Sequence, residues 1–199
     1  MEETVNKENG YTVYLAGELF DLKHIAGNAL LSESLSAVSS GRYRPVLPQD
    51  LELPSLEAKV IRDIDYAALL GCDAAIFQFD GSDLDSGTVA EFMTAKFVDI
   101  PSVLLRTDFR RSGDRNSNPW NLMCDSFPRT ESLVVDTMVL YSKEMEKGWM
   151  LASEVTKVVA YQVAAQLVEK LDTAIGTSVV LDEKENAEAR RLIRKTYDL

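Results

Sequence analysis

The sequence predicts an α/β protein: a single domain built on a parallel, flavodoxin- or Rossmann-like sheet of about five strands, flanked by helices and followed by a long C-terminal helix. Two observations support this fold class. In the first half of the chain, short apolar runs alternate with longer segments of helical periodicity, which is the pattern of right-handed βαβ units. The length of 199 residues, 46% of them hydrophobic, suits one domain with a full core.

The predicted elements begin with a strand at residues 11–17, which is rich in aromatic and β-branched residues and ends at a glycine. Residues 21–39 carry apolar side chains near helical spacing and end in a serine- and glycine-rich cluster, so a helix is predicted there. Residues 44–47 have weak strand character. The loop at residues 48–54 contains two prolines, which prevent continued regular structure.

A second helix is predicted over residues 55–70, where the apolar side chains share one face. Residues 73–79 are mostly apolar, as expected of a strand that is buried on both faces of a parallel sheet. A loop at residues 81–87 leads to a third helix at residues 87–98. Residues 101–105 form another buried strand, and the alternation implies a parallel sheet with right-handed crossovers.

The second half of the chain is predicted to be mainly helical. Residues 107–119 are polar and rich in turn formers, which indicates a long surface loop. A weaker strand at residues 132–141 closes the sheet. A long helix is predicted for residues 143–175, and because residues 155–168 are apolar on more than one face, we expect it to contact another subunit. The charged, amphipathic segment 182–199 is also predicted to be helical.

These elements divide the chain into three parts. Residues 1–10 form a polar leader, residues 11–141 form the α/β domain, and residues 142–199 form a helical extension. We expect the extension to pack on the domain or to form a subunit interface. No internal repeat or low-complexity stretch interrupts this order, so a single globular unit with appendages is predicted.

Charge and cysteine content limit the function classes. With 21 Lys and Arg against 32 Asp and Glu, the net charge of −11 opposes binding to a nucleic acid polymer or an anionic membrane, so a small ligand is the expected partner. Cys72 and Cys124 lie in no disulfide-framework or zinc-ligand spacing, and we expect no metal and no organic cofactor. No run reaches the about 18 apolar residues of a membrane span, and a cytoplasmic location is expected.

Candidate site residues follow the predicted strands, at the sheet edge where open parallel sheets bind ligands. Gly17, Glu18 and Phe20 follow the first strand. The carboxylates that follow the third strand are Asp80, Asp83, Asp85 and Glu91. Glu91 lies opposite the apolar face of its helix among small residues, which leaves clearance for a ligand, although an exposed surface glutamate gives the same pattern. Asp85 is equally explained as a helix cap. Two carboxylates flanking one site are sufficient for glycosyl transfer with retention.

Four segments resemble, in order, the motif series of the nucleoside 2-deoxyribosyltransferases. They are VYLAGELF at residues 13–20, DAAIF at 73–77, DSGTVAE at 85–91 and PWNLM at 119–123. The resemblance covers roughly residues 11–141 and leaves the long C-terminal helix and the tail outside it. Many members of the family have proline where this chain has Glu18, so the loop after the first strand differs in shape or charge.

The resemblance implies roles for individual residues. Glu91 is expected to be the nucleophile that holds deoxyribose as a covalent ester, and Tyr14 is expected to orient it by a hydrogen bond. Asp85 and Asp65 are implied on the side of the base, with Asp85 assisting the proton on the base nitrogen.

The resemblance also implies that sites are shared between subunits. Asn121 is expected to reach the sugar 5'-hydroxyl in a neighbouring subunit, with Met123 lining that site, in a dimer-based homo-oligomer. Gly17 and Phe20 after the first strand, and Gln49 after the second, complete the predicted substrate-binding set.

The expected activity is ping-pong transfer of 2-deoxyribose from a 2'-deoxynucleoside donor to a free nucleobase acceptor, as in nucleoside salvage. One alternative is a glycosidase that gives the same ester, from a deoxynucleoside or its 5'-monophosphate, to water. A phosphate group would require hydrogen-bond donors, and the dense basic cluster that could supply them is Arg106, Arg110, Arg111 and Arg115. The alternative interpretation is that these arginines belong to a solvated loop. A noncatalytic nucleotide sensor is the third possibility. The sequence leaves the base specificity and the oligomer number open.

Overall fold

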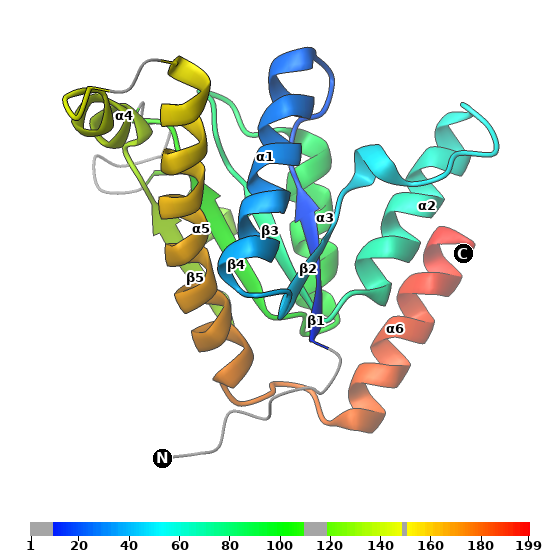
Figure 1. Cartoon of the computed structure of the whole chain (residues 1–199). Coiled ribbons are helices and arrows are strands. Elements are labelled where there is room, and N and C mark those ends of the chain that lie inside the picture. Colours follow the sequence, from blue (N-terminus) through cyan, green and yellow to red (C-terminus); the bar gives the residue numbers. More distant parts are fainter. Residues whose placement is uncertain (1–9, 110–118, 149–150) are drawn as a thin grey trace.

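The computed structural model describes residues 10–109, 119–148 and 151–199. Its centre is a five-stranded parallel sheet with the strand order β2-β1-β3-β4-β5, which confirms the predicted fold class (Figure 1). The strands, in chain order, are β1 Tyr11–Ala16, β2 Tyr43–Val46, β3 Ala74–Gln78, β4 Ser102–Arg106 and β5 Thr130–Val134. The first four lie within three residues of the predicted ranges at either end.

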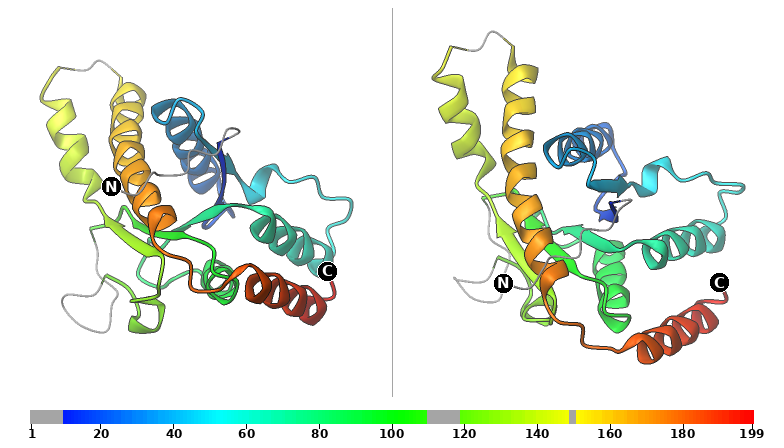
Figure 2. Two further views of the ribbon diagram at one scale, coloured as in Figure 1. Left: turned by 90° about the horizontal axis from the view of Figure 1, so that it is seen from below. Right: turned by 60° about the horizontal axis from the view of Figure 1, so that its bottom comes forward.

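Helices cover both faces of the sheet (Figure 2). They are, in chain order, α1 Leu22–Val38, α2 Ala58–Gly71, α3 Ser86–Phe97, α4 Thr137–Met145, α5 Ala152–Gly176 and α6 Glu183–Tyr197. Two 3-10 helices, η1 Pro48–Asp50 and η2 Leu122–Cys124, lie in the connections. One face carries α1 and α5, and the other carries α2, α3 and α6. None of the helices in the described ranges is long and apolar enough to cross a membrane.

Alternation of side chains along β1 fills both layers of the core. Val13 and Leu15 belong to the cluster under α1 and α5, whereas Tyr14 and Ala16 belong to the cluster under α2 and α3. All four are buried. Burial on both faces explains why the strand lacks alternating polar residues in the sequence. The alternation of side chains along β1 therefore directs Tyr14 towards the layer that contains α3.

The predicted boundaries of the last strand and the long helix are wrong. The strand predicted at residues 132–141 ends at Val134, and α4 begins three residues later because the Asp136 side chain caps it by accepting a bond from the Val139 N–H (3.1 Å). Gly148 then adopts a φ of 84°, which glycine tolerates, and α5 starts at Ala152 rather than at residue 143. Residues 141 and 142 both lie in α4, and the division of the chain between them stays a prediction.

The wide apolar surface of α5 is explained by contacts within the chain. This helix packs against α1, α4, β4 and β5. Its buried residues are Val155, Val159, Val163, Ala164, Leu167, Leu171 and Ala174. Its C-terminal half is fixed by Asp172, which accepts two hydrogen bonds from the Arg42 guanidinium (2.5 and 2.9 Å). Contact of α5 with another subunit stays a prediction, and its apolar width no longer requires one.

The charged tail forms the predicted helix, α6, which begins with a reciprocal capping box between Asp182 and Glu185. Its last turn lies beside α2, where the Tyr197 ring stacks on Tyr66 with the centroids 4.3 Å apart. The linker before α6 is held by Asp99, whose side chain accepts a bond from the Val180 N–H (2.8 Å). The tail therefore packs against the rest of the chain.

Candidate active site

The strand order creates a topological switch point at the carboxyl ends of β1 and β3. The chain leaves β1 through α1 towards β2 on one side, then crosses through α2 to β3 on the other side. Ligands of open α/β sheets bind at such a point because the loops diverge there. Gly17 and Glu18 follow β1, and the loop after β3 leads to Asp85 and to α3.

Glu91 and Tyr14 form a direct pair at this end of the sheet. The Tyr14 hydroxyl donates a hydrogen bond to Glu91 Oε1 over 2.7 Å. Tyr14 is fully buried on β1, and Glu91 lies in the middle of α3. Because the ring is locked in the core, it holds the carboxylate in one position. The structure thus brings together two residues that lie 77 positions apart in the sequence.

Burial keeps the Glu91 carboxyl poorly solvated and raises its pKa to about 7, against the lowering effect of the Tyr14 hydrogen bond. The negative charges of Asp65 and Asp85 add to this rise in pKa. Burial likewise raises the pKa of Asp65 to about 6, and burial together with the Glu91 charge raises the pKa of Tyr14. The cluster can therefore present Glu91 as a weakly hydrated carboxylate near neutral pH, which is a reactive state for a nucleophile.

Asp85 serves as the N-cap of α3. Its Oδ2 accepts bonds from the Thr88 N–H (2.7 Å) and the Thr88 hydroxyl (2.8 Å). The carboxylate also acts electrostatically on Glu91. The helix-cap explanation is therefore correct, and it does not remove Asp85 from the neighbourhood of the proposed nucleophile, because the cap places one charge at the start of the helix that carries the other.

Two other predicted residues contact side-chain amides near the carboxyl ends of the strands. Gly17 lies against the Gln78 side chain, and Gln49 is hydrogen-bonded to Asn28 and to the Ile25 carbonyl. Sequence reasoning missed Asn28 and Gln78, because polar residues on a helix and at a strand end normally face solvent. The only sequence signal for Gln78 is its place at the end of an otherwise apolar strand.

Three predicted residues lie on the surface of the subunit. Phe20 is 78% exposed and Met123 is 71% exposed. Asn121 is also exposed, and its side chain makes a local bond by accepting from the Met123 N–H (2.9 Å) at the start of η2. In the part of the chain that the structure describes, neither Asn121 nor Met123 is hydrogen-bonded to Glu91 or Tyr14. Because Asn121 and Met123 are exposed, they are accessible to another molecule.

Asp80 has a structural role. Its carboxylate accepts bonds from Thr107 N (2.6 Å), Thr107 Oγ1 (2.8 Å) and Asp108 N (3.0 Å), and so ties the loop after β3 to the loop after β4. Arg106 adds to the same junction by donating to the carbonyls of Phe79 (2.7 Å) and Gly81 (2.8 Å). The other members of the basic cluster, Arg110, Arg111 and Arg115, lie outside the described residues.

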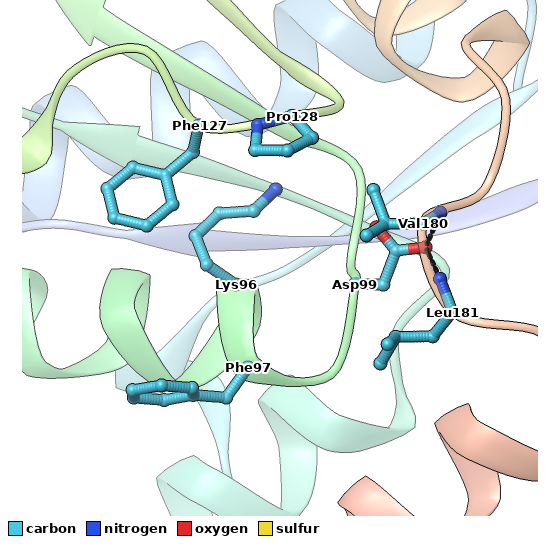
Figure 3. A pocket seen from close by; sticks show the side chains of 7 residues that line it. All are labelled: Lys96, Phe97, Asp99, Phe127, Pro128, Val180 and Leu181. Atoms are coloured by element: carbon cyan, nitrogen blue, oxygen red, sulfur yellow. Dashed lines mark hydrogen bonds between the residues drawn. The ribbon is translucent and has the colours of Figure 1, made fainter.

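A small cavity lies at the opposite end of α3 and does not match a nucleoside site (Figure 3). Its volume is about 180 Å³, below the roughly 300 Å³ at which ligand pockets begin. Its polar groups serve the fold: Lys96 Nζ donates to the Ile100 carbonyl (2.7 Å), and Asp99 holds the linker to α6. Among the described residues, no cluster of three His, Cys, Asp or Glu side chains is arranged to hold a metal ion.

The fold and the Glu91–Tyr14 pair define an α/β protein with a poorly hydrated carboxylate at the topological switch point of the sheet. A family model described as "Nucleoside 2-deoxyribosyltransferase" matches residues 13–123, more than half of the chain. The chain belongs to the nucleoside 2-deoxyribosyltransferase family. The matched region contains Tyr14, Asp65, Asp85 and Glu91, and the sequence-based resemblance is confirmed.

Solved structures with similar folds come from several organisms. A conserved protein from Enterococcus faecalis V583 superposes with a TM-score of 0.50 at 19% identity, over 81% of this chain and 97% of that chain. A 2-desoxiribosyltransferase from Leishmania mexicana gives a TM-score of 0.48 at 21% identity, over 69% and 99% of the two chains. A 2-deoxyribosyltransferase from Bacillus psychrosaccharolyticus gives a TM-score of 0.43 at 20% identity, over 57% of this chain and 79% of that chain. No curated protein sequence matches the chain. The first of these structures supports the fold alone.

Proposed function

We propose that the protein transfers 2-deoxyribose between nucleobases, acting on 2'-deoxynucleosides as donors and free nucleobases as acceptors. The observation that carries the proposal is the half-buried Glu91 carboxylate held by the Tyr14 hydroxyl at 2.7 Å. A carboxylate fixed beside a sugar can attack its anomeric carbon, and the resemblance of the chain to the matched family implies such a group.

In the proposed first half-reaction, a Glu91 oxygen forms a bond to the anomeric carbon while the bond from this carbon to the base nitrogen breaks. The base nitrogen takes up the bonding electron pair and a proton, with Asp85 assisting the proton transfer. In the second half-reaction, the nitrogen of an acceptor base attacks the anomeric carbon, the bond from this carbon to the Glu91 oxygen breaks, Glu91 leaves as a carboxylate, and the new base gives up its proton. The absence of a 2'-hydroxyl on the sugar eases the positive charge of the transition state.

A base-exchange assay tests this function. The protein is incubated with deoxyadenosine in the presence and absence of hypoxanthine, and the products are separated by chromatography. Appearance of deoxyinosine and adenine is the expected result. With donor alone, intact-protein mass spectrometry should show a deoxyribosyl adduct. Release of free deoxyribose without exchange would identify a hydrolase instead, and binding without turnover would identify a sensor.

We also propose that the site is completed by a second subunit, which contributes Asn121 and Met123. This rests on their exposure in the single subunit and on the family resemblance of the segment that carries them. A Glu91→Gln variant and an Asn121→Ala variant, each impaired alone, are unfolded together and refolded as a mixture. In a shared-site dimer, some sites receive both native residues, so roughly a quarter of the wild-type activity should return. Activity no higher than the average of the two variants would show that each site is self-contained.

A further inference from the structure

Three side-chain amides meet at the carboxyl edge of the sheet, and we refer to Gln78, Asn28 and Gln49 as the amide relay. Gln78 ends β3, Asn28 lies on α1, and Gln49 lies on η1. Gln78 Nε2 donates to Asn28 Oδ1 (2.9 Å), and Asn28 Nδ2 donates to Gln49 Oε1 (3.3 Å). Asn28 is only 5% exposed, so these bonds compete little with water.

Two backbone carbonyls fix the direction of the amide relay. Asn28 Nδ2 also donates to the Glu18 carbonyl (3.0 Å), and Gln49 Nε2 donates to the Ile25 carbonyl (3.2 Å). A carbonyl oxygen accepts and never donates, so turning either amide over would place two oxygens against each other. Gln49 is thereby held in one orientation, with one N–H and one oxygen lone pair left for a further partner.

The amide relay also borders the loop that follows β1. A Cβ atom on Gly17 would lie 2.6 Å from Gln78 Nε2 and 3.1 Å from Gln78 Cβ, so the absence of a side chain there lets Gln78 pack against the loop. The Glu18 carbonyl of the same loop is held by Asn28. The relay therefore joins the segments that follow β2, β1 and β3, and β1 also carries Tyr14, which orients Glu91.

We propose that Asn28 and Gln78 are positioning residues for base recognition: they hold Gln49 and the loop after β1 as one wall of the base site. This inference rests on the proposed transferase function. A primary amide offers a donor beside an acceptor, which matches the adjacent donor and acceptor atoms on the edge of a nucleobase. Because the relay fixes which atom of Gln49 faces which direction, it governs the fit of the base and leaves the attack by Glu91 unchanged.

The test replaces Asn28 by aspartate, which keeps the side-chain shape and removes the Nδ2 donor. Gln49 Oε1 and the Glu18 carbonyl then face an acceptor, and Gln49 loses its fixed orientation. We expect the KM for the acceptor base and the calorimetric Kd for adenine to rise roughly tenfold, since a hydrogen bond of this kind corresponds to about that factor. The kcat at saturating base should stay within about twofold of wild type.

Gln78→Met provides a second variant in case Asn28→Asp does not fold, because it removes the first donor of the relay from a strand end. The matched control is Ser34→Ala, which removes a buried polar group from the same helix, where the Ser34 hydroxyl donates to the Leu30 carbonyl (2.7 Å). This control should change thermal stability without changing base affinity. The ratio of activities with a purine and a pyrimidine acceptor should shift in the two relay variants only.

Two results would overturn the inference. One is an unchanged adenine Kd and an unchanged purine-to-pyrimidine ratio in both relay variants. The other is a loss of kcat alone, which would place the relay in the chemical step. If the wild-type protein binds adenine without exchanging it, the transferase function fails while the calorimetric comparison still decides the role of the relay. If the wild-type protein binds no base, both proposals fail.

Discussion

Replacing Glu91 by glutamine is expected to lower the rate of base exchange by roughly three orders of magnitude or more, because it removes the proposed nucleophile. The substitution keeps the size of the side chain, and the amide oxygen can still accept the hydrogen bond from Tyr14, which spans 2.7 Å in the wild type. What is lost is the negatively charged oxygen that is proposed to form the ester with the sugar. The exchange rate is measured by chromatography at saturating donor.

Two further measurements make this result specific. The deoxyribosyl adduct expected for the wild type in intact-protein mass spectra should be absent from the Glu91→Gln variant. Glu33→Gln, the same change at an exposed position of α1, serves as the control and should retain full activity. Substantial exchange by the Glu91→Gln variant would refute the assignment of the nucleophile, since no neutral amide can replace a carboxylate in this step.

The same substitution is expected to change how stability depends on pH. The folded-state pKa of Glu91, about 7, lies above its ordinary value of 4.5, so the unfolded chain gives up this proton first. The resulting contribution to stability is fully present below about pH 4.5 and is lost as the pH rises through 7. A shift of this size corresponds to roughly 3 kcal/mol, at about 1.4 kcal/mol for each pKa unit.

A glutamine at position 91 has no charge to bury, so the stability of the Glu91→Gln variant relative to wild type should increase between pH 4.5 and pH 8. The expected gain at the higher pH is roughly 5–10 °C in Tm. Differential scanning calorimetry at the two pH values measures it, and any constant effect of the new amide cancels in the comparison. Equal pH dependence of the two proteins would show that the Glu91 carboxyl is well solvated.

Sequence patterns predicted the centre of the sheet well because β1, β3 and β4 are largely buried on both faces. The runs around Ile76 and Leu104 are nearly all apolar, and this signal depends little on distant contacts. The end of β5 was missed for a local reason, because the N-cap Asp136 starts α4 in a segment whose composition suits either a strand or a helix. The break between α4 and α5 was missed because it depends on the left-handed Gly148. Such short polar signals are easily outweighed by periodicity over a longer window.

The candidate site was predictable in part. The clearance around Glu91 follows from helix geometry, but its partner Tyr14 looks like any core aromatic, and only the three-dimensional packing of β1 against α3 brings the two together. Asn28 had no sequence signal, because its buried position depends on Glu18, Gln49 and Gln78, which arrive from three other segments. Polar residues that satisfy one another in the interior are recognised from the fold rather than from a pattern.

The docking of α6 has a consequence for how freely this protein can diverge. The Asn186 side chain donates to the Val98 carbonyl (2.7 Å), and the Arg190 guanidinium donates to the Leu70 carbonyl, so both bonds end on main-chain oxygens at the C-terminal ends of α3 and α2. Helix ends leave such carbonyls without internal partners, and every amino acid provides one. These two bonds can therefore persist when side chains on α2 and α3 change over generations, whereas Tyr66 and Thr94, which contact Tyr197, hold the terminal helix through their own side chains.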